Sequence, residues 1–218
     1  GHLDHTGRLP LLSRFGYRGP VFATPATIEM TSLILRDSAR IQVGDAVRQT
    51  RKNQRAGLPP KEPLYTPEDA EAIIRCMRPA PYQKVVDVAP GIQAVWNEAG
   101  HMLGSASIQL IVVEDGRKTR VVFSGDLGPR TAPILRDYEP FRETDMVFLE
   151  STYGDHDHRP FQDTVEEFIE IVKTATQSGG KILVPTFAVG RAQLLIGLLG
   201  WMFRKRHSCW PGAGARHR

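Results

Sequence analysis

The chain has 218 residues, which is enough to bury a sizeable core as one large domain or two small ones. Its composition, 41% hydrophobic and 24% charged, is ordinary for a soluble globular protein, and its net charge of +4 permits a polyanionic partner without requiring one. Two cysteines in unrelated contexts argue against a disulfide framework and fit a reducing cytoplasm. The absence of an apolar run of about 18–20 residues argues against a membrane span.

The first five residues bring two imidazoles and a carboxylate together, on His2, Asp4 and His5. A tight turn can point these side chains inward together, whereas a helix would spread them around its axis. Imidazole nitrogen and carboxylate oxygen suit a divalent metal such as Zn²⁺. The alternatives are an ordinary polar amino terminus and, for Gly1-His2, the remnant of a tag.

A short apolar helix or turn is expected at 9–15, followed by a strand at 21–24. Pro25 then opens a helix that we expect to end near Gln42. Core packing is sufficient to explain the apolar side chains of this helix, which are Ile28, Leu33, Leu35 and Ile41.

Residues 45–63 are polar and basic and end in Pro59-Pro60. We interpret them as a solvated loop or a frayed helix rather than a nucleic-acid contact. The next helix has a strong start, with Thr66 as a hydroxyl cap, Pro67 at the first position and acids in the first turn. It is expected to run to about Arg78.

From residue 84 the pattern changes to short apolar runs bounded by turn residues, which predict strands. Asp115-Gly116 predicts a tight hairpin turn. The expected strands cover 85–88, 92–96, 107–113, 119–123, 145–150 and 181–186. The strand at 145–150 contains the apolar run 146–149 and is therefore expected to be buried. Helical spacing predicts an amphipathic helix over 161–176 and a further helix over 190–203.

Two later stretches end in metal-binding residue types, Ala99-Gly100-His101 and Ser124-Gly125-Asp126. Taken alone, each has an ordinary explanation: a hydrogen-bonded histidine in a turn between strands, and a common Ser-Gly-Asp turn. Small residues around His101 would let the backbone approach a crowded site closely.

Glu150 ends a strand and precedes Ser151-Thr152-Tyr153-Gly154, and by itself it reads as a cap or turn acid. Arg191 stands at a helix start, whose N–H groups can bind phosphate, with ordinary capping as the alternative. His156 and His158 lie in a polar loop and are interpreted as solvated.

In combination these motifs resemble the metallo-β-lactamase superfamily, and within it the β-CASP branch of nucleic-acid-processing nucleases. His2-Leu3-Asp4-His5 resembles the second superfamily motif, His-x-His-x-Asp-His, without its first histidine. The runs around His101 and Asp126 resemble the third and fourth motifs, and Glu150 with its Ser-Thr-Tyr-Gly resembles the first β-CASP motif. The likeness covers about residues 1–200 and is greatest with bacterial and archaeal ribonucleases related to the endonuclease subunit of the mRNA 3′-end cleavage factor.

The resemblance implies an α/β fold, namely an incomplete metallo-β-lactamase αββα sandwich with the beginning of an inserted β-CASP α/β domain. We expect residues 1–153 to form the partial core, without its first sheet, and 154–203 to start the β-CASP domain. Residues 204–218 have no periodicity and are expected to be a disordered or non-native tail, in which His207 and His217 do not match the later β-CASP histidines. The chain is therefore expected to be truncated at both ends.

A dinuclear zinc site is also implied by the resemblance, with Mn²⁺ as the alternative metal. His2 and His101 would serve one ion, Asp4 and His5 the other, and Asp126 would bridge the two.

The predicted catalytic residues are Asp4 and Glu150. Asp4 would orient the attacking water or take its proton, and Glu150 would orient a metal-ligating histidine. Substrate binding is assigned to Ser151, Thr152 and Arg191.

The function that the resemblance implies is hydrolysis of RNA phosphodiester bonds by a cytoplasmic, metal-dependent ribonuclease, with RNA as partner, no membrane association and a homodimer left open. The chain itself is expected to be poorly active because its site is incomplete. One alternative is a catalytically silent RNA-processing scaffold subunit, which the intact metal-ligand types argue against. The other is a small-molecule metallo-hydrolase, which the Glu150 motif disfavours.

Overall fold

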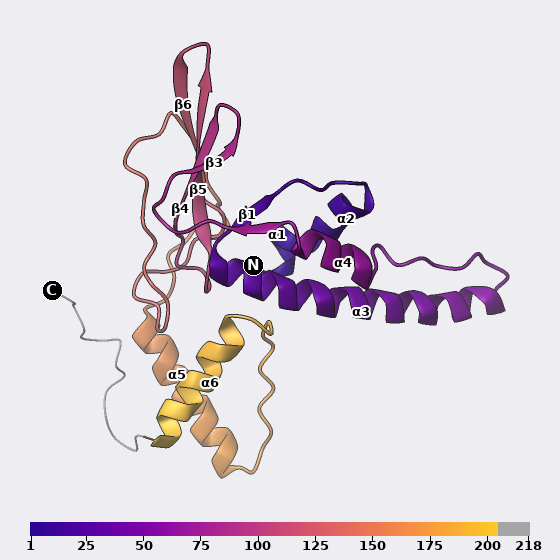
Figure 1. Cartoon of the computed structure of the whole chain (residues 1–218). Coiled ribbons are helices and arrows are strands. Elements are labelled where there is room, and N and C mark those ends of the chain that lie inside the picture. The colour runs from indigo at the N-terminus through magenta and orange to yellow at the C-terminus, as the bar shows by residue number, and fades with distance from the viewer. Residues whose placement is uncertain (205–218) are drawn as a thin grey trace. The chain divides into compact units, whose positions relative to one another are not determined.

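The computed structural model describes residues 1–204 and divides them into two compact units (Figure 1). The first unit comprises residues 1–130 and 135–148, and the second comprises 131–134 with the described residues from 149 onward. Beyond Arg204, the tail predicted over 204–218 lies outside the described residues. Both helices and strands are present, so the α/β class is confirmed.

A five-stranded sheet forms one part of the first unit, in the order β3-β4-β5-β6-β7. Its strands are β3 (Val86–Ala89), β4 (Ile92–Glu98), β5 (Ala106–Glu114), β6 (Arg117–Phe123) and β7 (Met146–Phe148). The first four are antiparallel neighbours, and β7 pairs parallel with β6. Asp115 and Gly116 both have positive φ, at 49° and 75°, which is the primed hairpin turn that the Asp-Gly pair predicts.

The strand expected at 145–150 was predicted to be buried, and that prediction is wrong. Met146, Val147 and Phe148 are 53%, 51% and 53% exposed. The physical reason is position, because β7 is an edge strand with a single neighbour in the sheet.

The helices of the first unit are α1 (Leu3–Thr6), α2 (Leu9–Arg14), α3 (Pro25–Arg55) and α4 (Pro67–Ile74). A two-stranded parallel sheet of β1 (Val21–Ala23) and β2 (Met77–Pro79) lies between them in the chain. One hydrophobic cluster joins α3 to α4 around Leu35, Tyr65 and Ile73, each fully buried. A second cluster, of Ala80, Ala94 and Trp96, packs against the strands of the larger sheet.

Helix α3 continues to Arg55, so its predicted end near Gln42 was wrong. Residues 45–55 hold neither proline nor a capping glycine, and their Arg, Lys and Gln side chains are good helix formers, so helix formation continues until Gly57 takes a left-handed φ of 68°. Two apolar residues expected in the core, Leu33 and Ile41, are 66% and 54% exposed, whereas Leu35 is fully buried. Only one face of α3 packs on the body of the unit.

Helix α4 begins as predicted, with a capping box between Thr66 and Asp69. It ends at Ile74 rather than near Arg78, because Met77–Pro79 pairs with β1 as a strand. A partner strand more than fifty residues upstream therefore decides the state of this segment.

In the second unit, α5 (Phe161–Gln177) and α6 (Arg191–Arg204) confirm the two predicted helices. The strand predicted at 181–186 is absent from the structure. A strand needs a partner for its backbone hydrogen bonds, and no strand of the described second unit pairs with this segment. None of the helices within residues 1–204 has the length and apolar character to cross a membrane.

Candidate metal centre

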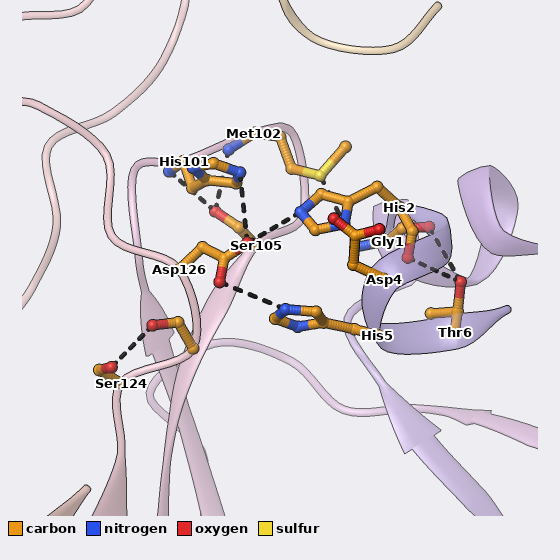
Figure 2. Close-up of polar contacts among 11 residues, drawn as sticks. Gly1, His2, Asp4, His5, Thr6, His101, Met102, Ser105, Ser124 and Asp126 are labelled. Carbon is orange, nitrogen blue, oxygen red and sulfur yellow. Dashed lines mark hydrogen bonds and ion pairs between the residues drawn. The ribbon is translucent and has the colours of Figure 1, made fainter. Parts of the chain in front are cut away.

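The carboxylate of Asp126 is approached by three imidazoles, as Figure 2 shows. His2 Nε2 lies 2.9 Å from Oδ2, His101 Nε2 lies 3.6 Å from Oδ2, and His5 Nε2 lies 3.2 Å from Oδ1. The structure therefore brings together four of the five residues predicted to bind metal, from three separate parts of the chain.

His2 and His5 are presented by the one-turn helix α1, not by the tight turn that the sequence suggested. His2 is the N-cap and His5 stands three residues later, a spacing that puts two side chains on one side of a helix. Their rings are 4.9 Å apart between centroids and meet edge to face. The turn is fixed by Thr6, a buried residue whose hydroxyl donates to His2 O at 2.9 Å.

His101 lies in the loop between β4 and β5, and Ser105 holds that loop in shape. Ser105 Oγ accepts from the backbone N–H of His101 at 3.1 Å and of Met102 at 3.2 Å. The carboxylate of Glu98 accepts from Gly100 N at 3.0 Å and from Ser105 Oγ at 3.5 Å. Two side chains thus satisfy three backbone donors of the turn that carries His101.

The same loop is tied to the start of α3 through the carbonyl of Gly104. The hydroxyls of Thr24 and Thr27 each donate to this oxygen at 2.7 Å. Gly104 has φ +84°, and a Cβ there would lie 2.6 Å from Thr27 N, so no larger residue fits.

Asp126 follows β6, and Gly128 joins its loop to the His101 loop. Gly128 N donates to Ala99 O at 2.9 Å, and a Cβ on Gly128 would lie 1.8 Å from Gly100 O. The close approach of the two loops depends on the missing side chain. The sequence analysis assigned no role to Ser105, Thr24, Thr27 or Gly128. For Gly128 a signal was present in the run Ser-Gly-Asp-Leu-Gly, where a second glycine two residues after Asp126 indicates a close backbone approach.

The residues present fit a divalent metal ion. His2, His101 and Asp126 each offer a ligand atom within 4.8 Å of the other two. Ligands about 2.0–2.2 Å from Zn²⁺ in a tetrahedron lie about 3.3–3.6 Å apart, and the two measured nitrogen–oxygen distances of 2.9 and 3.6 Å are close to that spacing. His2 Nδ1 is buried with no hydrogen-bond partner among the described residues, so the ring is held without the outer hydrogen bond that usually orients a ligating histidine.

Asp4 lies at the margin of this group. Its carboxylate is 85% exposed, and its Oδ2 is 3.7 Å from His2 Nδ1, beyond hydrogen-bond reach. A cavity of about 260 Å³ adjoins the cluster and is lined by His2, His5, His101 and Asp126 together with apolar side chains such as Trp96. The cavity and the candidate ligands therefore share one site.

Four predicted site residues belong to the second unit. Glu150 Oε2 accepts from Thr152 N at 3.3 Å, Ser151 and Thr152 are exposed, and Arg191 is the exposed first residue of α6. The roles assigned to these four residues stay predictions.

Comparison with known proteins gives two groups of relatives. The chain is 39% identical over 198 residues to ribonuclease TTHA0252 of Thermus thermophilus, which covers 91% of this chain and 41% of that protein. It is 35% identical over 195 residues to transcription termination factor FttA of Cenarchaeum symbiosum and 33% identical over 201 residues to FttA of Methanocaldococcus jannaschii. These matches cover 88% and 89% of this chain but 28% and 29% of the archaeal proteins. The chain thus spans about two fifths or less of the length of these relatives.

No protein-family model matches the chain. Among solved structures, the Rm3 metallo-beta-lactamase matches 56% of this chain and 37% of that chain, with 22% sequence identity and a TM-score of 0.29.

Proposed function

We propose that the chain belongs to the β-CASP ribonuclease branch of the metallo-β-lactamase superfamily and forms part of a metal-dependent ribonuclease that hydrolyses RNA phosphodiester bonds. The observation that carries the proposal is the convergence of His2, His5 and His101 on Asp126. By the resemblance of their motifs, these side chains match the positions at which the family holds its metal ions, and the chain is 39% identical to a ribonuclease.

The proposed centre holds two zinc ions, with Mn²⁺ as the alternative. His2, His101 and Asp126 would hold one ion, and Asp4, His5 and Asp126 the other. Zinc is the choice because imidazole and carboxylate donors are its usual ligands. When bound, the ions would polarise a phosphoryl oxygen and make water acidic enough to attack at neutral pH.

Asp126 would serve as the shared anion of the centre. Two cations about 3.5–4 Å apart repel each other, and a carboxylate between them offsets that repulsion. Its two oxygens already face different histidines, Oδ1 toward His5 and Oδ2 toward His2 and His101. Each oxygen is thus directed at one half of the proposed ligand set.

Asp4 is proposed to hold the attacking water and to accept its proton. Its 85% exposure leaves the carboxylate accessible from solvent, and its position 3.7 Å from His2 Nδ1 keeps it beside the ligands. A general base must reach the proton it removes, and a carboxylate at the margin of the cluster meets that requirement.

The remaining roles concern the second unit. Glu150 is proposed to orient a ligating histidine, and Ser151, Thr152 and Arg191 to bind the RNA backbone. We assign residues 1–153 to a partial metallo-β-lactamase core and 154–203 to the start of a β-CASP domain. A cytoplasmic location and a homodimer remain part of the proposal.

The test is cleavage of a 5′-labelled RNA in the presence of Zn²⁺, compared with hydrolysis of a thioester and a β-lactam. Asp126→Asn should abolish RNA cleavage, whereas Asp87→Asn, an exposed aspartate on β3, should retain it. Hydrolysis of the thioester or lactam with RNA left intact would replace the proposal by a small-molecule hydrolase. Metal and RNA binding without any cleavage would replace it by a silent scaffold.

A further inference from the structure

The last turns of α3 carry four basic side chains in one stripe, Arg48, Arg51, Lys52 and Arg55, called here the basic stripe. Spacings of three, four and seven residues place all four on one face of the helix. All four are exposed. Figure 1 shows this end of α3 extending past α4, with the chain returning from it.

The charge of the stripe is mostly uncompensated. Arg48 pairs with Asp45 one turn before it, whereas Arg51, Lys52 and Arg55 form no ion pair with any residue in the described part of the chain. The segment from Arg40 to Lys61, with both ends included, holds six Arg or Lys residues and a single acid, a local excess larger than the +4 of the whole chain.

The rest of the helix and its loop leave the stripe uncovered. The buried residues of α3 lie on the opposite face. The returning loop is also held on that side, where Asn53 Nδ2 donates to Pro59 O at 2.7 Å and Lys61 N donates to Thr50 Oγ1 at 2.9 Å. These bonds order the end of the helix and keep the loop away from the stripe.

Helix stability explains only part of the stripe. Lys52 and Arg55 stand in the last turn of α3, where the helix dipole favours cations. Arg48 and Arg51 lie before that turn, and like charges three and four residues apart destabilise a helix. A polyanion laid along the stripe would reverse this cost, since phosphates would neutralise the repulsion.

The opposite end of α3 lies at the metal cluster. Thr27 donates to Gly104 O in the His101 loop, and Met30 lies beside Gly1. At about 1.5 Å per residue, Arg48 is about 27 Å and Arg55 about 37 Å along the helix from Met30. A stacked single strand advances about 3.4 Å per nucleotide, so about 8–11 nucleotides span that distance.

We propose that the basic stripe binds the phosphate backbone of single-stranded RNA about 8–11 nucleotides from the phosphate held at the Asp126 cluster. This inference rests on the proposed ribonuclease function and adds a requirement on substrate length. Short RNA would reach only one of the two sites at a time, and longer RNA would reach both sites at once.

The test is equilibrium binding of a fluorescent 20-nucleotide and a 6-nucleotide RNA across a range of salt concentrations. The stripe variant replaces Arg48, Arg51, Lys52 and Arg55 by Gln, a good helix former. The control variant replaces four exposed basic residues elsewhere in the first unit by Gln and loses the same charge: Lys84, Arg117, Lys118 and Arg142.

The stripe variant should bind the 20-nucleotide RNA about tenfold more weakly, and its slope of log affinity against log salt should fall by about 0.7 per charge removed. Its affinity for the 6-nucleotide RNA, which cannot span both sites, should fall much less, and the control variant should bind both RNAs nearly as wild type does. Circular dichroism of both variants checks that α3 is intact.

Equal losses from the stripe and control variants, an unchanged salt slope in the stripe variant, or no RNA binding by wild type would each overturn the inference. Binding is read without cleavage, so the two proposals fail separately. If RNA binding depends on the stripe but the RNA is never cut, only the ribonuclease proposal is overturned. If the stripe variant cuts RNA and binds it with wild-type affinity, only the present inference is overturned.

Discussion

His2 and Asp126 are 124 residues apart in the sequence, and His2 Nε2 lies 2.9 Å from Asp126 Oδ2. This contact joins the start of α1 to the loop that follows β6. His101 Nε2 approaches the same oxygen at 3.6 Å, so one carboxylate atom is shared by two imidazoles, one at the N-cap of α1 and one in the loop between β4 and β5. A cation would be stabilised most at this shared oxygen, because its coordination bonds would replace the nitrogen–oxygen contacts.

Replacing His101 should weaken zinc binding, whereas replacing a histidine outside the cluster should not. His101→Ala removes one of the three grouped ligands. We expect zinc affinity to fall by more than about 100-fold, which exceeds the usual loss when a residue that only orients a ligand is removed. His158→Ala is the matched control because that histidine contacts Tyr153 in the second unit. Competition with a chromogenic chelator measures both, and wild-type affinity in His101→Ala would contradict the assignment.

Ser105→Ala should lower zinc affinity although Ser105 is not a predicted ligand. The change leaves the N–H groups of His101 and Met102 without their acceptor, so the loop that presents His101 loosens. We expect about a 10-fold loss, the lower end of the range for residues that orient a ligand. The same titration applies, with Ser178→Ala at the end of α5 as the control. An unchanged affinity would show that the loop holds its shape without this hydroxyl.

Two glycine-to-alanine changes should shift stability in opposite directions. Gly128→Ala forces a Cβ onto the carbonyl of Gly100 and should destabilise the protein by at least about 1–3 kcal/mol, the usual cost of overpacking. Gly44→Ala adds a methyl group in the middle of α3 near only the tip of Arg48, and should stabilise by about 0.5–1 kcal/mol. Urea unfolding midpoints report both signs. A stable Gly128→Ala protein would mean that the two loops separate at little cost.

Tyr82 should ionise later than an ordinary tyrosine. Burial, followed by the nearby charge of Glu98, raises the pKa of Tyr82 from 10.0 to about 12. Because the folded state holds this proton more tightly than the unfolded state, the associated stability is complete below pH 10 and is lost as the pH rises toward about 12. Ultraviolet absorbance measured against pH follows tyrosine ionisation, and the curves of wild type and Tyr82→Phe should differ by one group that ionises late. A difference curve centred near pH 10 would contradict the burial of Tyr82.

Local signals in the sequence determined several elements of this protein. The Thr66–Asp69 capping box starts α4, and the Asp115-Gly116 pair makes the hairpin turn between β5 and β6. The periodic helices α5 and α6 also formed where the spacing placed them. Each of these signals acts through hydrogen bonds and dihedral preferences within a few residues, so each can be read without knowing the rest of the fold.

The residue types of the candidate site were visible in the same way. His2, His5, His101 and Asp126 were singled out from their motifs, but their spacing says nothing about distance in space. Their meeting depends on the order of β4, β5 and β6, which delivers the His101 and Asp126 loops to one end of the sheet.

Only the tertiary structure decided the features that depend on distant partners. Residues 77–79 form a strand because β1 pairs with them, whereas 181–186 form no strand, since no strand of the described second unit pairs with them. The same holds for Gly128, whose role arises from a carbonyl 28 residues earlier in the chain. Pairing and close packing are relations between segments, and a sequence read locally carries the preferences of each segment but not the neighbour that satisfies them.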